Sequence, residues 1–213
     1  MGWLLLGLAG AGAYLYSLIT GDTQLGLLAK GIPVIALLFW LRQTKPGVYR
    51  RWISLGLLFS LAGDLLLAWP GDLFVQGLSA FLFAHLAYLR AYLHNTRHPA
   101  LLALLPALLI GGGMFAVLAN AGLGQLLMPV ACYVTAISLM FWRALAQLGH
   151  PRLQPRSTWL AAGGAALFVL SDSLIGIDRF LVSFDAAPYA IIVTYWLGQW
   201  GITASAFSRS NSA

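Results

Sequence analysis

Charged residues are scarce in this chain. Lys, Arg, Asp and Glu together form 8% of its 213 residues, against roughly 25% in a typical soluble domain. Hydrophobic residues form 60%, and the mean hydropathy is +0.83. A soluble fold would leave much of this apolar surface in water, so the composition excludes one and predicts a protein embedded in a membrane.

Cysteine is nearly absent as well, since Cys132 is the only one. A single thiol excludes an intrachain disulfide and a thiolate metal site. His94, His98 and His150 lie in polar connections and cannot join His85 as ligands, so zinc is not expected. No Walker loop, dinucleotide fingerprint or nucleophile elbow occurs in a supporting context. We therefore expect no metal and no cofactor.

What the chain does contain is a series of long apolar runs. Each is long enough to cross a bilayer core, which takes about 20 helical residues. Spanning β-barrels need short alternating segments instead. The sequence predicts an all-α membrane bundle of about eight transmembrane helices, forming a single domain 1–213 with a short polar tail at 208–213. The predicted spans are 3–20, 25–42, 52–69, 74–93, 100–118, 125–146, 158–177 and 187–207.

Basic residues are distributed unequally over the connections between these spans. One set of connections, on the side of both termini, carries nearly all the Lys and Arg, whereas the opposite set contains only Arg179 together with four aspartates. Basic connections stay in the cytoplasm, so both termini are predicted to be cytoplasmic. We expect an integral protein of the bacterial inner (plasma) membrane, in which the net charge of +6 reflects topology and not binding to nucleic acid.

Asp72 immediately precedes the span predicted at 74–93 and follows a Pro-Gly pair. Aspartate is a favoured residue at the N-cap of a helix, where its carboxylate accepts a hydrogen bond from a free N–H group. We therefore predict that Asp72 caps this span.

Two of the six acidic residues, Asp64 and Asp172, lie inside predicted spans. A carboxylate in the middle of a span costs about 2.5–3.5 kcal/mol on insertion scales, so such residues usually have a function. Small and hydroxylated neighbours place both on inward-facing helix surfaces. Each lies about six residues, or about 8 Å, before the outer end of its span, so the two share one depth. We predict that they form a catalytic pair.

Polar residues on facing spans are candidates for the walls of a binding pocket. Lys30 lies at about the depth of the two aspartates. His85 and Tyr88 share one face of the span at 74–93, and Tyr195 and Gln199 share one face of the last span. The structural alternative is a set of interhelical hydrogen bonds, a Lys–Asp pair and a packed histidine.

The segments around both aspartates resemble the signatures of the YhhN-type lysoplasmalogenase family. The first signature corresponds to residues 58–67 followed by 81–88, and the second to residues 167–175 followed by Arg179-Phe180. Residues of the sixth and last spans also fit the family, which often has Lys-Pro where this chain has Lys30-Gly31. Together with the resemblance, the candidate substrate-binding residues are Lys30, His85, Tyr88, Tyr133, Ser171, Tyr195 and Gln199.

The resemblance implies hydrolysis of the vinyl-ether bond of a lysoplasmalogen, which gives a fatty aldehyde and a glycerophospho-alcohol. The partners would be a lysophospholipid substrate and membrane lipids. One protonated aspartate would donate a proton to the β-carbon, and the other, ionised, would stabilise the oxocarbenium ion and activate water. Neighbouring carboxyl groups in an apolar setting readily share one proton. Which aspartate has which role stays open.

Two other functions use the same pair of carboxyl groups. A proton- or cation-coupled transporter of small molecules or lipids would use them as a relay. An aspartate-dyad peptidase would use them to activate water on a peptide bond, but neither Asp64 nor Asp172 stands in the sequence context of that class. A purely structural scaffold gives no reason for two carboxyl groups at one depth.

Overall fold

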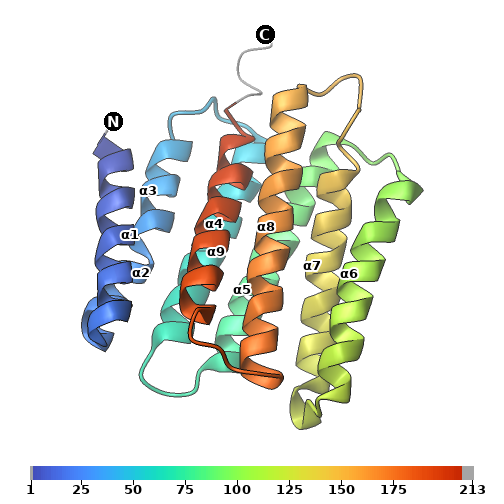
Figure 1. Cartoon of the computed structure of the whole chain (residues 1–213). Coiled ribbons are helices and arrows are strands. Elements are labelled where there is room, and N and C mark those ends of the chain that lie inside the picture. The colour runs from blue at the N-terminus through green and yellow to red at the C-terminus, as the bar shows by residue number, and fades with distance from the viewer. Residues whose placement is uncertain (1, 208–213) are drawn as a thin grey trace.

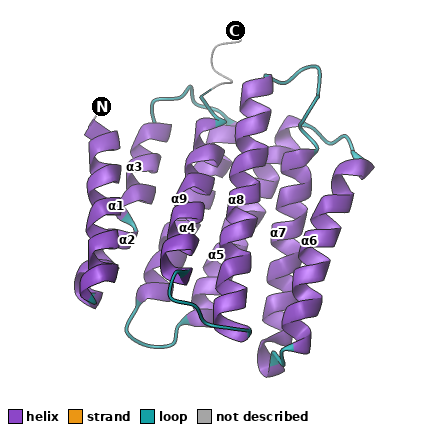
Figure 2. Ribbon diagram, in the orientation of Figure 1, coloured by secondary structure: helices purple, strands orange, loops and turns teal. Residues whose placement is uncertain are grey.

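The computed structural model describes residues 2–207, which form helices joined by short connections (Figures 1 and 2). No strand occurs in this range. The predicted polar tail, 208–213, lies outside it. The elements are α1 (Gly2–Thr20), α2 (Thr23–Lys30), α3 (Ile32–Leu41), α4 (Val48–Ala68), α5 (Phe74–Asn95), α6 (Leu101–Asn120), the 3-10 turn η1 (Gly124–Leu126), α7 (Leu127–Leu145), α8 (Pro155–Phe180) and α9 (Ala187–Ala204).

The second predicted span is one helix with a break, formed by α2 and α3. The break lies at Gly31, directly after Lys30. Pro33 follows it at the start of α3, and its missing N–H leaves the carbonyl one turn earlier without its helical hydrogen bond. With α2 and α3 counted together, the described residues form eight helical segments, as predicted. The Lys30-Gly31 departure from the Lys-Pro pattern thus coincides with the interruption of the helix.

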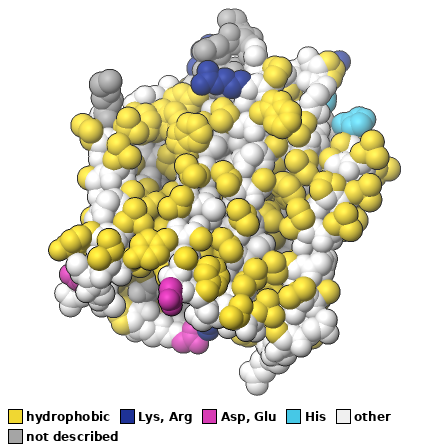
Figure 3. All heavy atoms as spheres, viewed as in Figure 1, with side chains coloured by type: hydrophobic (Ala, Val, Ile, Leu, Met, Phe, Trp, Pro, Cys, Tyr) yellow, Lys and Arg dark blue, Asp and Glu magenta, His cyan; other side chains and the backbone are white. Residues whose placement is uncertain are grey.

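The outer surface of the bundle is apolar. Six of the helical segments in the described range are long and apolar enough by themselves to cross a membrane, with α2 and α3 acting as one; α5 and α9 are not among them. These two fall short because they carry polar residues toward the interior, including His85 and Gln199, which are fully buried. Hydrophobic side chains cover the molecule between its two ends (Figure 3). The protein is therefore a polytopic helical membrane protein.

The helices form two facing pairs with further helices at each side (Figure 1). The α8–α9 pair and the α4–α5 pair are bridged by α7 on one side and by α3 on the other, and α2 packs on α4. The peripheral helices are α1, which packs on α2 and α3, and α6, which packs on α7 and α8. The first helix begins and the last helix ends at the same end of the bundle (Figure 1).

Glycines allow the close contacts within each pair. A Cβ atom at Gly164 of α8 would lie 2.6 Å from the backbone nitrogen of Ile202 in α9, and one at Gly63 of α4 would lie 2.6 Å from the Phe81 ring of α5. Small residues at such contacts let membrane helices pack closely. The Gly63 contact lies next to Asp64, and the Gly164 contact lies about two turns before Asp172 on α8, so both fix helices that carry a predicted catalytic residue.

The predicted spans agree with the observed helices except at their ends. The third span, for example, begins at Val48 and not at residue 52. Hydropathy marks the apolar core, whereas the helix continues into the polar region, where Arg50 donates a hydrogen bond to the Thr44 carbonyl at 2.5 Å. Helix ends extend beyond the apolar run because long basic side chains keep their charged groups in the polar layer.

The predicted cap of α5 was wrong. The N-cap residue is Leu73, and no side chain accepts a hydrogen bond there. The Leu73 N–H bonds to the Gly71 carbonyl, and the N-cap lies one residue later than predicted. The Asp72 carboxylate instead accepts hydrogen bonds from Arg179 at the end of α8.

Candidate active site

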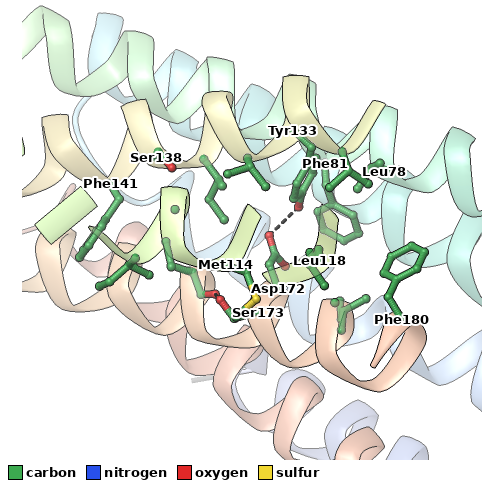
Figure 4. A pocket seen from close by; sticks show the side chains of 18 of the residues that line it. Leu78, Phe81, Met114, Leu118, Tyr133, Ser138, Phe141, Asp172, Ser173 and Phe180 are labelled. Atoms are coloured by element: carbon green, nitrogen blue, oxygen red, sulfur yellow. Dashed lines mark hydrogen bonds between the residues drawn. The ribbon is translucent and has the colours of Figure 1, made fainter. Parts of the chain in front are cut away.

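Asp172 lies on α8 within a small group of polar side chains. Its Oδ2 accepts a hydrogen bond from the Tyr133 hydroxyl of α7 at 2.5 Å (Figure 4). The same oxygen lies 3.2 Å from Nε2 of His85 on α5, and this nitrogen lies 2.9 Å from the Tyr133 hydroxyl. Three side chains from three helices therefore converge within hydrogen-bonding distance. Two of them, His85 and Tyr133, were predicted as substrate-binding residues.

An apolar pocket opens beside Asp172, between α5, α6, α7 and α8. The space between its lining atoms is about 800 Å³, part of it open to the surroundings. On α7 it extends from Val130 to Phe141, which is about 16 Å along the helix axis. Phe180 lies at one end, Phe141 at the other, and Asp172 with Tyr133 between them (Figure 4). The pocket is thus an elongated apolar channel with one carboxyl group in its wall.

Asp64 lies in a second group of polar residues. Its side chain is buried in α4 and accepts a hydrogen bond from the Tyr195 hydroxyl of α9 at 2.7 Å. One turn further along α9, Gln199 accepts a hydrogen bond from the Tyr88 hydroxyl at 2.7 Å. Lys30 is close enough for its charge to interact with that of Asp64, although no ion pair of 4.0 Å or less joins these two described residues. The predicted residues Lys30, Tyr88, Tyr195 and Gln199 therefore gather around Asp64.

Aromatic rings separate the two groups. Phe168, fully buried on α8, has its ring centroid 4.8 Å from that of His85 and 5.4 Å from that of Tyr195. No hydrogen bond joins the two aspartates in the described part of the chain. Asp172 lines the apolar pocket described above, and Asp64 is not among the residues of that pocket. The structure brings both aspartates into the interior and gives each its own partners.

Ser171 has a different environment from the other predicted residues. Its hydroxyl donates a hydrogen bond to the Ile191 carbonyl of α9 at 3.0 Å. The side chain thus faces α9 and links the backbone of that helix to α8. Its assignment as a substrate-binding residue stays a prediction.

The sequence analysis missed the end of the pocket formed by Phe74 and Phe180. These rings lie 5.8 Å apart at 73°, and both line the pocket. The guanidinium of Arg179 lies 3.9 Å from the centroid of the Phe74 ring and forms an ion pair with Asp72 at 3.1 Å. The feature of the sequence that could have indicated this end of the pocket is Arg179, the one basic residue in the set of connections that carries four aspartates.

The described residues contain no group of three or more His, Cys, Asp or Glu side chains that could hold a metal ion. The polar atoms around Asp172 come from one carboxyl group, one phenol and one imidazole. This set is suited to proton transfer.

Comparison with known proteins identifies the family. The model of the YhhN family matches residues 25–206. Lysoplasmalogenase TMEM86B of Homo sapiens is 34% identical over 180 residues, which cover 84% of this chain and 74% of the relative. Lysoplasmalogenase of Mycobacterium bovis is 33% identical, and the match covers 97% of this chain and 84% of the relative. No solved structure matches. The chain belongs to the YhhN family.

Proposed function

We propose that this protein is a lysoplasmalogenase, which hydrolyses the vinyl-ether bond of a lysoplasmalogen to a fatty aldehyde and a glycerophospho-alcohol. The observation that carries the proposal is the position of the Asp172 carboxyl group in the wall of an elongated apolar pocket. A lipid tail bound in this pocket would lie beside a group that can donate a proton. The relatives named lysoplasmalogenase, in mammals and in mycobacteria, support the same activity. No observation specifically favours transport.

The pocket fits the hydrocarbon part of such a substrate. Its lining is mostly apolar and lies inside the membrane part of the bundle, with Leu78, Met114 and Ile137 among the lining residues. A single alkenyl chain can extend from Asp172 toward Phe141, which leaves the glycerol at the end near Phe180. A pocket enclosed between four helices holds one lipid tail more readily than two, so we propose a single-chain lipid as the substrate.

Asp172 is placed to transfer the proton. In the proposed reaction its carboxyl group protonates the β-carbon of the vinyl ether, and the adjacent carbon becomes an oxocarbenium ion. Hydrogen bonds from Tyr133 and His85 stabilise the carboxylate that remains. Water then adds to the cation and returns a proton to Asp172. The resulting hemiacetal collapses to the aldehyde and the alcohol, so no proton is consumed overall.

Asp64 is proposed to act on the same step through its charge. It is buried behind Phe168 with Tyr195 as its hydrogen-bond donor. A carboxylate in this position stabilises positive charge that develops nearby, because electrostatic interactions are strong in an apolar interior. Tyr88 and Gln199 hold the side of α9 that carries Tyr195 against α5.

We also propose the orientation in the membrane. Lys and Arg side chains gather at the end where α1 begins, and acidic side chains at the opposite end (Figure 3). The basic end is cytoplasmic by the positive-inside rule, so both termini face the cytoplasm and the Phe180 end of the pocket faces outward. Bacterial relatives whose match covers nearly the whole chain support the inner membrane of a bacterium as its location.

The direct test is aldehyde release by the purified protein in detergent from lysoplasmenylethanolamine or lysoplasmenylcholine. Asp172→Asn keeps the size of the side chain but removes the acid, so the rate should fall by at least about 10²-fold. Asp22→Asn is the matched control: Asp22 caps α2 far from the pocket, asparagine caps equally well, and the rate should not change. If the native protein released no aldehyde from any vinyl-ether lipid, the proposed function would be wrong.

A further inference from the structure

The ion pair between Arg179 and Asp72 lies at the Phe74–Phe180 end of the pocket. Arg179 precedes Phe180 in α8, and its guanidinium is stacked on the Phe74 ring. The pair therefore joins the end of α8 to the start of α5 at this end of the pocket. We propose that Arg179 binds the phosphate of the substrate headgroup. This inference rests on the proposed function.

The spacing along α8 fits the substrate. Asp172 and Arg179 are seven residues apart, which is nearly two full turns and about 10 Å of rise, so both lie on about the same face of the helix. In a lysoplasmalogen, seven bonds separate the β-carbon of the vinyl ether from the phosphorus, or about 8 Å in an extended chain. The long side chain of Arg179 can span the remaining difference between these two lengths. With the β-carbon at Asp172, the phosphate therefore lies at Arg179.

The groups at the Phe74–Phe180 end of the pocket favour the binding of an anion. A guanidinium presents several N–H donors in a planar fork that matches the oxygens of a phosphate. The helix α5 begins beside it without a side-chain cap, and uncapped N–H groups at a helix start attract phosphate groups as well. Arg179 is also the one basic residue that the sequence places on this side of the membrane.

The existing ion pair does not prevent this binding. The side chain of Asp72 is 76% exposed and that of Arg179 is 39% exposed, and ion pairs of such exposed groups contribute little to stability. A phosphate can therefore replace Asp72 as the partner. The neighbouring Asp178 is turned toward the following connection, where it accepts hydrogen bonds from the Ser183 hydroxyl and the Phe184 N–H.

A structural role for Arg179 makes a different prediction. A basic residue in the last turn interacts favourably with the helix dipole, and the ion pair links two helices. If only these effects mattered, loss of Arg179 would impair all substrates equally, and loss of Asp72 would have the same effect as loss of Arg179. Phosphate binding affects only substrates that carry a phosphate and requires only Arg179.

The experiment compares two substrates with the same alkenyl chain, lysoplasmenylethanolamine and 1-alkenylglycerol, which lacks the phosphate. For Arg179→Gln, KM for the phospholipid should rise at least about tenfold, the effect of losing a charged hydrogen bond, and kcat/KM for 1-alkenylglycerol should stay unchanged. Asp72→Asn breaks the same ion pair and keeps the guanidinium, so the preference for the phospholipid should remain. Equal losses on both substrates, or equal effects of the two variants, would overturn the proposal.

A binding measurement separates this proposal from the proposed function. The saturated ether lysophospholipid has the same tail and headgroup but no vinyl ether, so its affinity is measured by calorimetry without turnover. Arg179→Gln should weaken its binding at least about tenfold, and Asp72→Asn should not. Inorganic phosphate at the concentration of the lipid should not compete, because it lacks the tail. Equal affinity of the native and Arg179→Gln proteins refutes phosphate binding, whatever the protein does to vinyl ethers.

Discussion

At the scale of single residues, the site depends on hydrogen bonds between side chains of different helices. Asp172, Tyr133 and His85 form one group, and the His85 ring is fully buried. Nδ1 of this ring has no hydrogen-bond partner among the described residues. Nε2 of the same ring lies within hydrogen-bonding distance of both the Tyr133 hydroxyl and the Asp172 carboxyl group, an arrangement suited to proton transfer. This group therefore has the features of a reaction centre more than those of a packing contact.

The Tyr133 hydroxyl should support the reaction. Tyr133→Phe removes its hydrogen bond to Asp172, and hydrogen bonds to charged groups contribute about 1.5–3 kcal/mol. If the bond strengthens as the carboxylate forms, kcat for aldehyde release should fall about tenfold to a hundredfold. Tyr92→Phe is the control, because the buried Tyr92 hydroxyl has no hydrogen-bond partner among the described residues. Equal rates for the two variants would mean that Tyr133 only fills space.

The two aspartates should not contribute independently. Asp64→Asn should lower the rate by at least about 10²-fold, as Asp172→Asn does, because its charge acts on the same step. The double variant should be hardly slower than either single variant, since residues that act as a unit are not additive. Rates are measured on samples with the same folded fraction. Multiplicative losses in the double variant would show that the residues serve separate steps.

At the scale of elements, α8 is the helix that carries the site. It holds Asp172 toward α5 and α7 and packs closely on α9 along its other side. The close contact depends on Gly164, where a Cβ atom would meet the backbone of α9. A backbone cannot move away as a flexible side chain can, so the position of α8 depends on the absence of this one atom.

Substitutions of two neighbouring glycines should therefore have opposite effects. Gly164→Ala overpacks the α8–α9 contact and should destabilise the protein by about 1–3 kcal/mol. At Gly163, a Cβ atom would have no neighbour within 4 Å, and alanine is the better helix former, so Gly163→Ala should leave stability unchanged or raise it. Thermal unfolding in detergent measures both variants. A stable Gly164→Ala protein would contradict the close packing of α8 on α9.

At the scale of the whole molecule, the chain has a basic end and an acidic end joined by an apolar belt (Figure 3). Lipid tails are as apolar as these side chains, so the belt needs no protein partner. By the positive-inside rule the asymmetry of charge predicts the orientation, and in the proposed orientation a headgroup would reach Arg179 from the outer side.

The orientation is testable with reporters fused after Ala213 in a bacterial host. Both termini are predicted in the cytoplasm, because the basic connections stay there. A fluorescent protein at this position should fluoresce, and alkaline phosphatase should be inactive. An active phosphatase would place the C-terminus outside and would move the Phe180 end of the pocket to the cytoplasmic side.

The sequence by itself determined the class of fold, the number of helical segments in the described residues and the two interior aspartates. The length of an apolar run and the presence of a charged residue within it can be read directly from the sequence. In a bilayer, only helices and closed barrels satisfy all backbone hydrogen bonds, so these local features are enough to predict the class of fold. The sequence did not determine the ends of the helices, the cap of α5 or the division of the polar residues into two groups. These depend on contacts between distant segments, such as Phe168 between His85 and Tyr195. The equal depth of the two aspartates in their spans predicted that they lie close together. Only the packing of the helices, which fixes how each helix is rotated about its axis, decided that Asp172 lines the apolar pocket and Asp64 does not.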